Sequence, residues 1–102
     1  MDDRDLLRAA ADRLEALAAR TTAGDWRTGG LLATRPEVVA HRDGEAGTEH
    51  VAEARAGTAA WITALSPAVG PPLADWLRAA AAAPSVEPAA TALARVLLDR
   101  LP

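Results

Sequence analysis

The stretch 18-AARTTAGDWRTGG-30 marks the change from a helical pattern to a strand pattern in this chain of 102 residues. Before it, apolar residues recur every three or four positions, and after it short apolar runs alternate with turn formers. Gly24 is the expected stop signal of the first helix. Trp26 is expected to pin the first strand against the apolar faces that carry Trp61 and Trp76. We therefore expect Trp26→Ala to cost on the order of 3 kcal/mol of stability.

The segment before this stretch has the pattern of an amphipathic helix from Asp2 or Asp3 to about Arg20. Acidic residues crowd its first turn, where they favour the helix dipole. Arg8 and Asp12 are spaced as an i, i+4 pair on the solvated face. The apolar stripe consists of Leu7, Ala10, Leu14, Leu17 and Ala18.

The segment from Trp26 to His50 predicts two or three short strands. Its apolar runs contain β-branched valines and are separated by Pro36 and by the polar 42-RDGEAG-47. Asp43-Gly44 within that separator is a hairpin-type signal. A small antiparallel sheet is the expected result.

Two helices separated by a turn are expected between Thr58 and Ala83. Thr58 is the candidate N-cap of the first, which carries Trp61 and Leu65 on one side. Two consecutive prolines would break a helix begun at Pro67, but they fit the first turn of a new one. We therefore expect a turn over Ser66–Gly70 and a helix over Pro71–Ala83. Its inward residues are expected to be Leu73, Trp76, Leu77 and Ala80.

A last helix is expected to be capped by Ser85 and to run through Leu101. Its packing stripe consists of Val86, Ala90, Leu93, Val96 or Leu97, and Leu101. The whole pattern predicts one small α+β domain over 1–102: an N-terminal helix, a two- or three-stranded antiparallel sheet, then three C-terminal helices. Because much of the apolar content is alanine, the core should be thin, and dimerisation would enlarge it.

The net charge and amino-acid composition of the chain argue against several classes of protein. The net charge of −3 and the pI near 5.2 argue against a protein that wraps nucleic acid, which requires clustered cations. The chain has no cysteine, so a disulfide framework and a thiolate nucleophile are excluded. The acidic N-terminus does not resemble a secretory signal, and no apolar run approaches the length of a membrane span. A soluble cytoplasmic protein without membrane contact is expected.

The metal-like residues are His41, Glu45, Glu49 and His50. Their side chains could in principle bind a divalent ion, but their spacing is not diagnostic, and residues placed in this way are usually solvated or cross-strand partners. A small enzyme would require His41, Glu49 and His50 to converge in one cleft. Since no nucleophile or phosphate-loop motif is present, we expect neither catalysis nor a cofactor.

Nucleic-acid binding is the alternative to a protein-binding role. The segment Thr58–Arg78 could form a helix-turn-helix, but its second helix offers only Arg78 to DNA, and Asp75 would repel the backbone. A second version of this alternative uses arginines of the sheet and its loops. These are Arg27, Arg35, Arg42 and Arg55.

Three motifs resemble a group of small proteins encoded by actinobacteria, their phages and integrated elements. 21-TTAGDW-26 resembles that group's Thr-Pro-Gly-Pro-Trp turn at Thr22, Gly24 and Trp26. 58-TAAWITALSPAVGPPLADWL-77 resembles its downstream signature, and 90-ATALARVLL-98 resembles its closing helix. The matching residues of the downstream signature are Trp61, Pro67, Asp75 and Trp76.

The resemblance overlaps the phage early-region accessory proteins of Ead type and implies no known activity, cofactor or catalytic residue. The departures lie at Ala23, Asp25 and Pro71-Pro72, where the group usually has proline in the first two cases and a plain helical residue in the third. The expected function is that of a non-enzymatic interaction or regulatory protein of phage or mobile-element type. We expect it to form a homodimer and to bind a host or phage protein.

Overall fold

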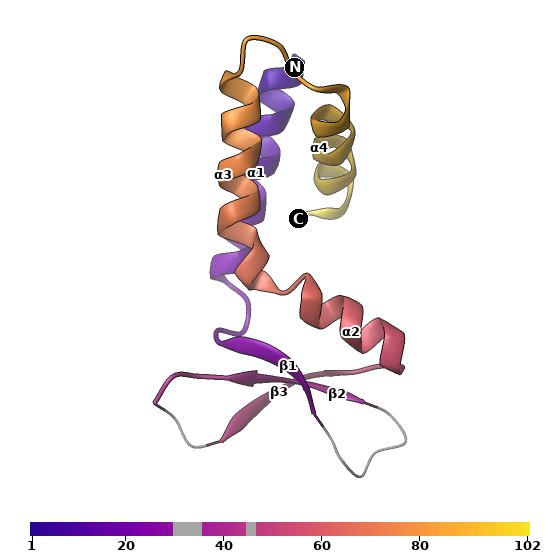
Figure 1. Cartoon of the computed structure of the whole chain (residues 1–102). Helices are drawn as coiled ribbons and strands as arrows, with labels where there is room; N and C mark the ends of the chain where they lie inside the picture. The colour runs from indigo at the N-terminus through magenta and orange to yellow at the C-terminus, as the bar shows by residue number, and fades with distance from the viewer. Residues whose placement is uncertain (30–35, 45–46) are drawn as a thin grey trace. The chain divides into compact units, whose positions relative to one another are not determined.

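The computed structural model describes residues 1–29, 36–44 and 47–102. Within them the chain forms a three-stranded antiparallel sheet and helical segments, so the α+β class is confirmed (Figure 1). The elements in chain order are α1 (Asp3–Ala19), β1 (Asp25–Gly29), β2 (Glu37–His41), β3 (Thr48–Glu53), α2 (Ala56–Ala64), a 3₁₀ turn (Pro67–Val69), α3 (Gly70–Ala82) and α4 (Pro88–Arg100).

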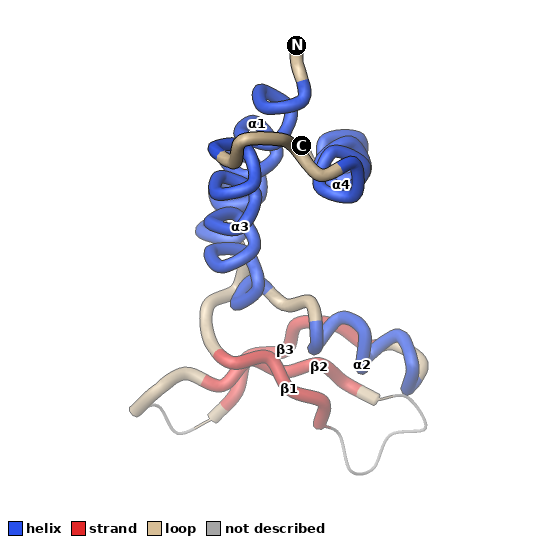
Figure 2. The backbone as a smooth tube through the Cα atoms, turned by 45° about the horizontal axis from the view of Figure 1, so that its top comes forward, coloured by secondary structure: helices blue, strands red, loops and turns tan. Residues whose placement is uncertain are grey.

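The chain divides into two compact units. The first, here the helical unit, comprises residues 1–21 and 69–102, and the second, the sheet unit, comprises residues 22–68. Figure 2 shows that the sheet unit contains the three strands and α2, whereas the helical unit contains α1, α3 and α4. The single domain over 1–102 stays a prediction, and each unit is described by itself.

A capping box begins α1. The Asp2 carboxylate accepts the backbone N–H of Asp5 at 2.8 Å, and the Asp5 carboxylate accepts the backbone N–H of Asp2 at 3.4 Å. The bond from Asp5 N–H holds the pKa of the Asp2 carboxyl below its ordinary value. Arg8 pairs with Asp5 at 3.6 Å. The expected partner Asp12 is instead bonded to Arg78 at 3.0 Å.

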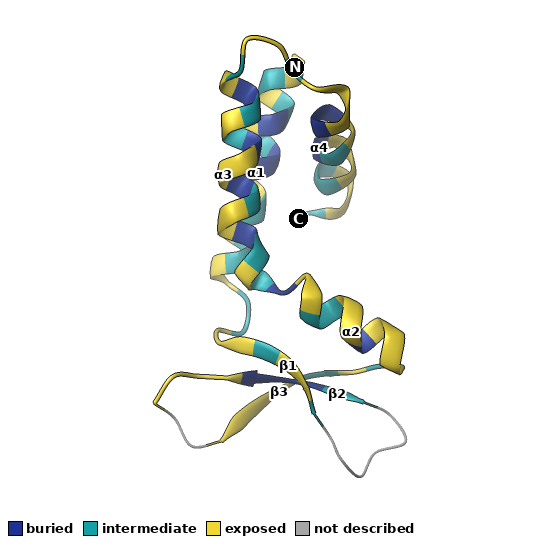
Figure 3. Cartoon of the chain, in the orientation of Figure 1, coloured by how far each residue is buried: buried dark blue, intermediate teal, exposed yellow. Residues whose placement is uncertain are grey.

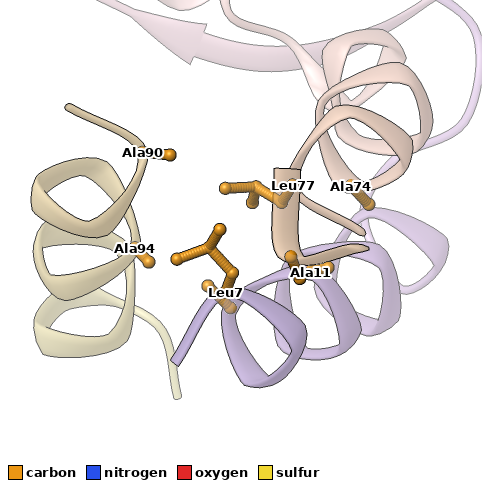
Figure 4. Close-up of a cluster of buried hydrophobic side chains, with 8 residues drawn as sticks. Leu7, Ala11, Ala74, Leu77, Ala90 and Ala94 are labelled. Atoms are coloured by element: carbon orange, nitrogen blue, oxygen red, sulfur yellow. The ribbon is translucent and has the colours of Figure 1, made fainter. Parts of the chain in front are cut away.

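The core of the helical unit lies where α1 meets α3 and α4. Leu7 and Leu77 are fully buried there, and the rest of the cluster is alanine (Figure 4). The alanines are Ala10, Ala11, Ala74, Ala81, Ala90 and Ala94. Small residues let helix axes approach closely, and a Cβ on Gly70 would lie only 2.7 Å from the Cβ of Ala18.

Two of the three tryptophans, Trp61 and Trp76, are exposed, so the expectation that Trp76 faces inward is wrong. The side chain of Trp76 is 48% exposed and that of Trp61 is 67% exposed. Leu77, one residue after Trp76, is fully buried as predicted, while Leu73 and Ala80 are half-buried against the core. Val96 in α4 is 59% exposed, so Leu97 is the packing residue of the predicted pair.

Two arginines fasten α3 to other parts of the helical unit. The Arg4 guanidinium donates to the carbonyls of Ala81, Ala83 and Pro84, so it satisfies acceptors that a helix C-terminus leaves open. Arg78 donates to Glu15 at 3.1 and 3.2 Å and to Asp12 at 3.0 Å. These carboxylates, Glu15 first, raise the pKa of Arg78, which therefore stays charged.

The sheet unit is an antiparallel meander with β2 in the centre. Trp26 pairs with Ala40 and Arg27 with Val39, and on the other side Val39 pairs with His50. A register irregularity lies between Val38 and Val39. The central strand is buried at Val38, Val39 and Ala40, and α2 packs against β1 and β2. The hairpin signal at Asp43-Gly44 falls between β2 and β3, where Gly44 has a φ of 74°.

Gly24 does not end α1, which corrects the expectation from the sequence. The helix stops at Ala19, where the N–H of its C-cap Arg20 bonds to Leu17 and Ala18 carbonyls. Gly24 instead precedes β1 with a φ of 115°, and a Cβ there would lie 2.6 Å from the carbonyl oxygen of His41. The glycine is therefore needed because β1 and the end of β2 approach each other closely.

The side-chain caps predicted at Thr58 and Ser85 do not form at the N-termini of α2 and α4. Helix α2 begins at Ala56 after Arg55, not at Thr58, and α4 begins at Pro88 after Glu87, not at Ser85. Neither N-cap residue makes a side-chain cap bond. Pro71 lies in the first turn of α3 as predicted, although that helix begins one residue earlier, at Gly70.

Candidate protein-interaction surface

The solvent side of α2 is an apolar surface, here called the α2 outer face. It consists of Gly57, Ala60, Trp61, Ala64 and Leu65, which are all exposed and recur at helical spacing. Trp61 is 67% exposed and Leu65 is 54% exposed. The opposite side of the helix is the buried one, since Ala59 is fully buried and Ile62 and Thr63 are half-buried. Figure 3 shows α2 mostly in the colour of exposed residues.

The absence of charge distinguishes the α2 outer face from the rest of the chain. From Ala56 to Ala74 the sequence runs for nineteen residues without an acidic or basic side chain (74 − 56 + 1), although a quarter of the chain is charged. Interface cores are depleted in charge and enriched in aromatic residues. An exposed tryptophan in an uncharged segment therefore has the composition of a contact surface rather than of ordinary solvent-exposed helix.

Other exposed apolar residues have charged neighbours. Trp76 in α3 is flanked by Asp75, which lies 3.6 Å from Arg78, and Val96 follows Arg95, which lies 3.8 Å from Asp3. Single exposed apolar side chains among charges are common on protein surfaces. Trp76 and Val96 therefore serve as reference positions for the α2 outer face.

The structure separates two of the residues that a metal or catalytic site would require, Glu49 and His50. Glu49 and His50 are consecutive in β3, so their side chains point to opposite faces of the sheet. Glu49 pairs with Arg42 at 2.6 Å, and His50 pairs with Glu37 at 3.1 Å. Glu45 lies outside the described residues. Among those that are described, no group of three acidic or histidine residues is placed to hold a metal ion.

The arginines proposed for nucleic-acid contact do not form an unpaired cationic group in the described part of the chain. Arg27 donates to Asp25 at 2.7 Å and Arg42 to Glu49 at 2.6 Å. Arg55 is exposed at the start of α2, and Arg35 lies outside the described residues. Paired guanidinium groups would lose their carboxylate partners on meeting phosphate, so this arrangement does not favour the alternative.

The two helices of the hypothetical helix-turn-helix, α2 and α3, belong to different units. Arg78, the residue assigned to DNA, is held by Asp12, Glu15 and Asp75. A base-reading arginine needs its donors available for base edges. The structure thus gives this motif no support.

The predicted motif residues have mainly structural positions. Trp26 donates its Nε1–H to the carbonyl of Thr22 at 2.9 Å, so these two residues and Gly24 shape the entry to β1. Pro67 begins the 3₁₀ turn. Sequence reasoning missed the exposure of Leu65 and its small neighbours in the α2 outer face, although the uncharged run of 56–74 was a signal for it.

No helix among the described residues is long and apolar enough to cross a membrane. Comparisons of the chain with protein-family models, with curated proteins and with solved structures find no match. The resemblance to small actinobacterial and phage proteins therefore rests on the quoted motifs alone.

Proposed function

We propose that the protein is a non-enzymatic interaction or regulatory protein that binds another protein through the α2 outer face. The observation that carries this proposal is the exposure of Trp61 and Leu65 on a helix without charge. Tryptophan is the residue type most enriched among binding hot spots. The setting of a phage or mobile element, and a host or phage protein as partner, come from the motif resemblance.

Site-specific photo-crosslinking tests this function. A benzophenone amino acid replaces Trp61 in the full chain, which is then expressed in cells of the native host and irradiated. A discrete protein adduct is expected at position 61, since this side chain would lie in the interface. The same amino acid at Trp76 is the matched control, because that tryptophan is also exposed but has charged neighbours.

An adduct at position 61 that is absent at position 76 supports the proposal. Equal adducts at both positions, or none at position 61, would contradict it. Far-ultraviolet circular dichroism of each variant checks that the helices and the sheet are retained.

A further inference from the structure

We infer that the occupant of the α2 outer face is a second copy of this chain, packed against it as an antiparallel α2 pair about a two-fold axis. This inference rests on the proposed function, because it names the partner of the same surface. Two properties of the surface carry it, its charge and its shape, and its size sets the expected strength of the contact.

The charge pattern permits self-contact. In a two-fold interface the same patch lies on both sides, so a charge near the axis meets an identical charge. The α2 outer face has none, and the charges that bound the segment in sequence are Arg55 and Asp75. Specific recognition of a different protein commonly uses complementary charge, which this face does not offer.

The shape is complementary to itself. Trp61 and Leu65 project as large side chains, whereas Gly57, Ala60 and Ala64 are small positions on the same face. A Cβ built on Gly57 would meet nothing within 4 Å, so this position is open. In an antiparallel pair centred between Ala60 and Trp61, Trp61 of one copy lies opposite Ala60 of the other, and Leu65 lies opposite the Ala56 end of the helix. Each copy therefore supplies both parts of the packing.

The size of the face limits the strength of the contact. Nine residues of helix span about 14 Å, and the face exposes one tryptophan and one leucine as large apolar anchors. A stable interface usually buries about 800 Å² on each partner, more than one short helix face provides. A two-fold contact brings Trp61 and Leu65 of both copies into one interface, but the area buried on each copy stays small, so the contact should be weak and reversible. We expect a dimer with a dissociation constant on the order of micromolar.

Sedimentation equilibrium of the full chain tests the dimer. The wild-type protein is expected to shift from monomer to dimer with rising concentration, and Trp61→Ala to raise the dissociation constant at least about 30-fold, as loss of a hot-spot residue does. Trp76→Ala is the matched control and is expected to change it less than about threefold. A wild-type monomer at all concentrations, or a dimer that Trp76→Ala alone disrupts, would overturn the inference.

Charge complementation tests the two-fold arrangement. Ala60 is exposed and lies beside the midpoint of the face, so Ala60→Glu and Ala60→Arg should each place like charges near the axis and remain monomeric. An equimolar mixture of the two variants should restore the dimer. If the single variants dimerise as the wild type does, or if the mixture stays monomeric while the wild type dimerises, the arrangement is wrong.

The outcomes separate this inference from the proposed function. A monomeric wild-type chain that forms an adduct with a different protein at position 61 overturns the second-copy inference and retains the function. A monomeric chain without any adduct at that position overturns both. An adduct of twice the chain mass in the purified protein supports both.

Discussion

The two units of this chain differ in how far they bury their apolar side chains. The helical unit places leucine and alanine between three helices, and hydrogen bonds of Arg4 and Arg78 join α1 to α3 and its C-cap. The sheet unit buries the centre of β2 and one side of α2 but leaves the other side of α2 apolar and exposed. A general shortage of polar residues does not explain the exposure of Trp61, because the exposed tryptophan of the helical unit, Trp76, directly follows Asp75, which pairs with Arg78.

The largest expected effect is a loss of stability of the helical unit. Leu77→Ala removes a fully buried side chain and should cost about 3 kcal/mol, because the closely packed helices cannot collapse into the cavity. Hydrogen exchange measured by mass spectrometry should show amides of α1, α3 and α4 accelerated by about 100-fold. Val38→Ala, in the sheet unit, should cost about 2 kcal/mol and act on β2. If either variant accelerates both units equally, the units do not open separately and the comparison fails.

Trp26→Ala should weaken the sheet unit by about 2 kcal/mol. This value is smaller than the sequence alone led us to expect, because the indole is half-buried rather than buried. The substitution also removes the bond from Nε1 to the Thr22 carbonyl. Urea unfolding measures the loss. Trp26→Phe keeps an apolar ring without the donor and should lose less, whereas equal losses would mean that only the hydrogen bond matters.

Thr91→Val should stabilise the helical unit by about 1 kcal/mol. The hydroxyl of Thr91 is buried and finds no hydrogen-bond partner within the described residues, so valine of the same shape removes a desolvation cost. Thr63→Val in the sheet unit is the control, because its hydroxyl donates to the Ala59 carbonyl at 2.8 Å. Thermal unfolding should show a higher midpoint for Thr91→Val only. A gain for both variants would mean that apolar volume, not the unsatisfied hydroxyl, decides the effect.

The smallest expected effect is the loss of stability at low pH that comes from the capping carboxylate at the start of α1. The pKa of Asp2 is lowered in the folded chain, so its contribution to stability is present above the ordinary carboxyl value of 3.8 and is lost as pH falls through the lowered folded value. Thermal unfolding midpoints between about pH 5 and pH 2 measure this loss. Asp2→Asn keeps a capping acceptor without a titrating group and should show a shallower dependence on pH. Identical pH profiles would exclude Asp2 as a source of acid sensitivity.

The helices and the hairpin could be predicted because their signals are local. Apolar spacing around Leu7 and Leu77, acidic residues at the start of α1 and Asp43-Gly44 each act within a few residues of chain. The sequence indicates a structural role for Gly24, but the expected role, ending the first helix, is wrong. Its partner, the His41 carbonyl, is seventeen residues away (41 − 24), and pairing of β1 with β2 creates that contact.

The α2 outer face could not be predicted from local sequence patterns, because they do not show which apolar side chains remain exposed. Trp61, Trp76 and Leu77 are all apolar residues of helices, yet the first two are exposed and the third is buried. Burial depends on which side of a helix meets another element: Leu77 packs in the core between helices, whereas Trp76 in α3 and Trp61 in α2 lie on outer sides. The alternation of a strand likewise separates Glu49 from His50, two of the residues that the sequence grouped as metal-like.

By itself, the sequence determined the helix and strand segments, their approximate order, the absence of thiol chemistry and the uncharged run of 56–74. Only the tertiary structure decided which apolar side chains are enclosed and which side of α2 remains open. The physical reason is that secondary structure arises from interactions between neighbours in sequence, whereas burial arises from close packing between segments that are distant in sequence.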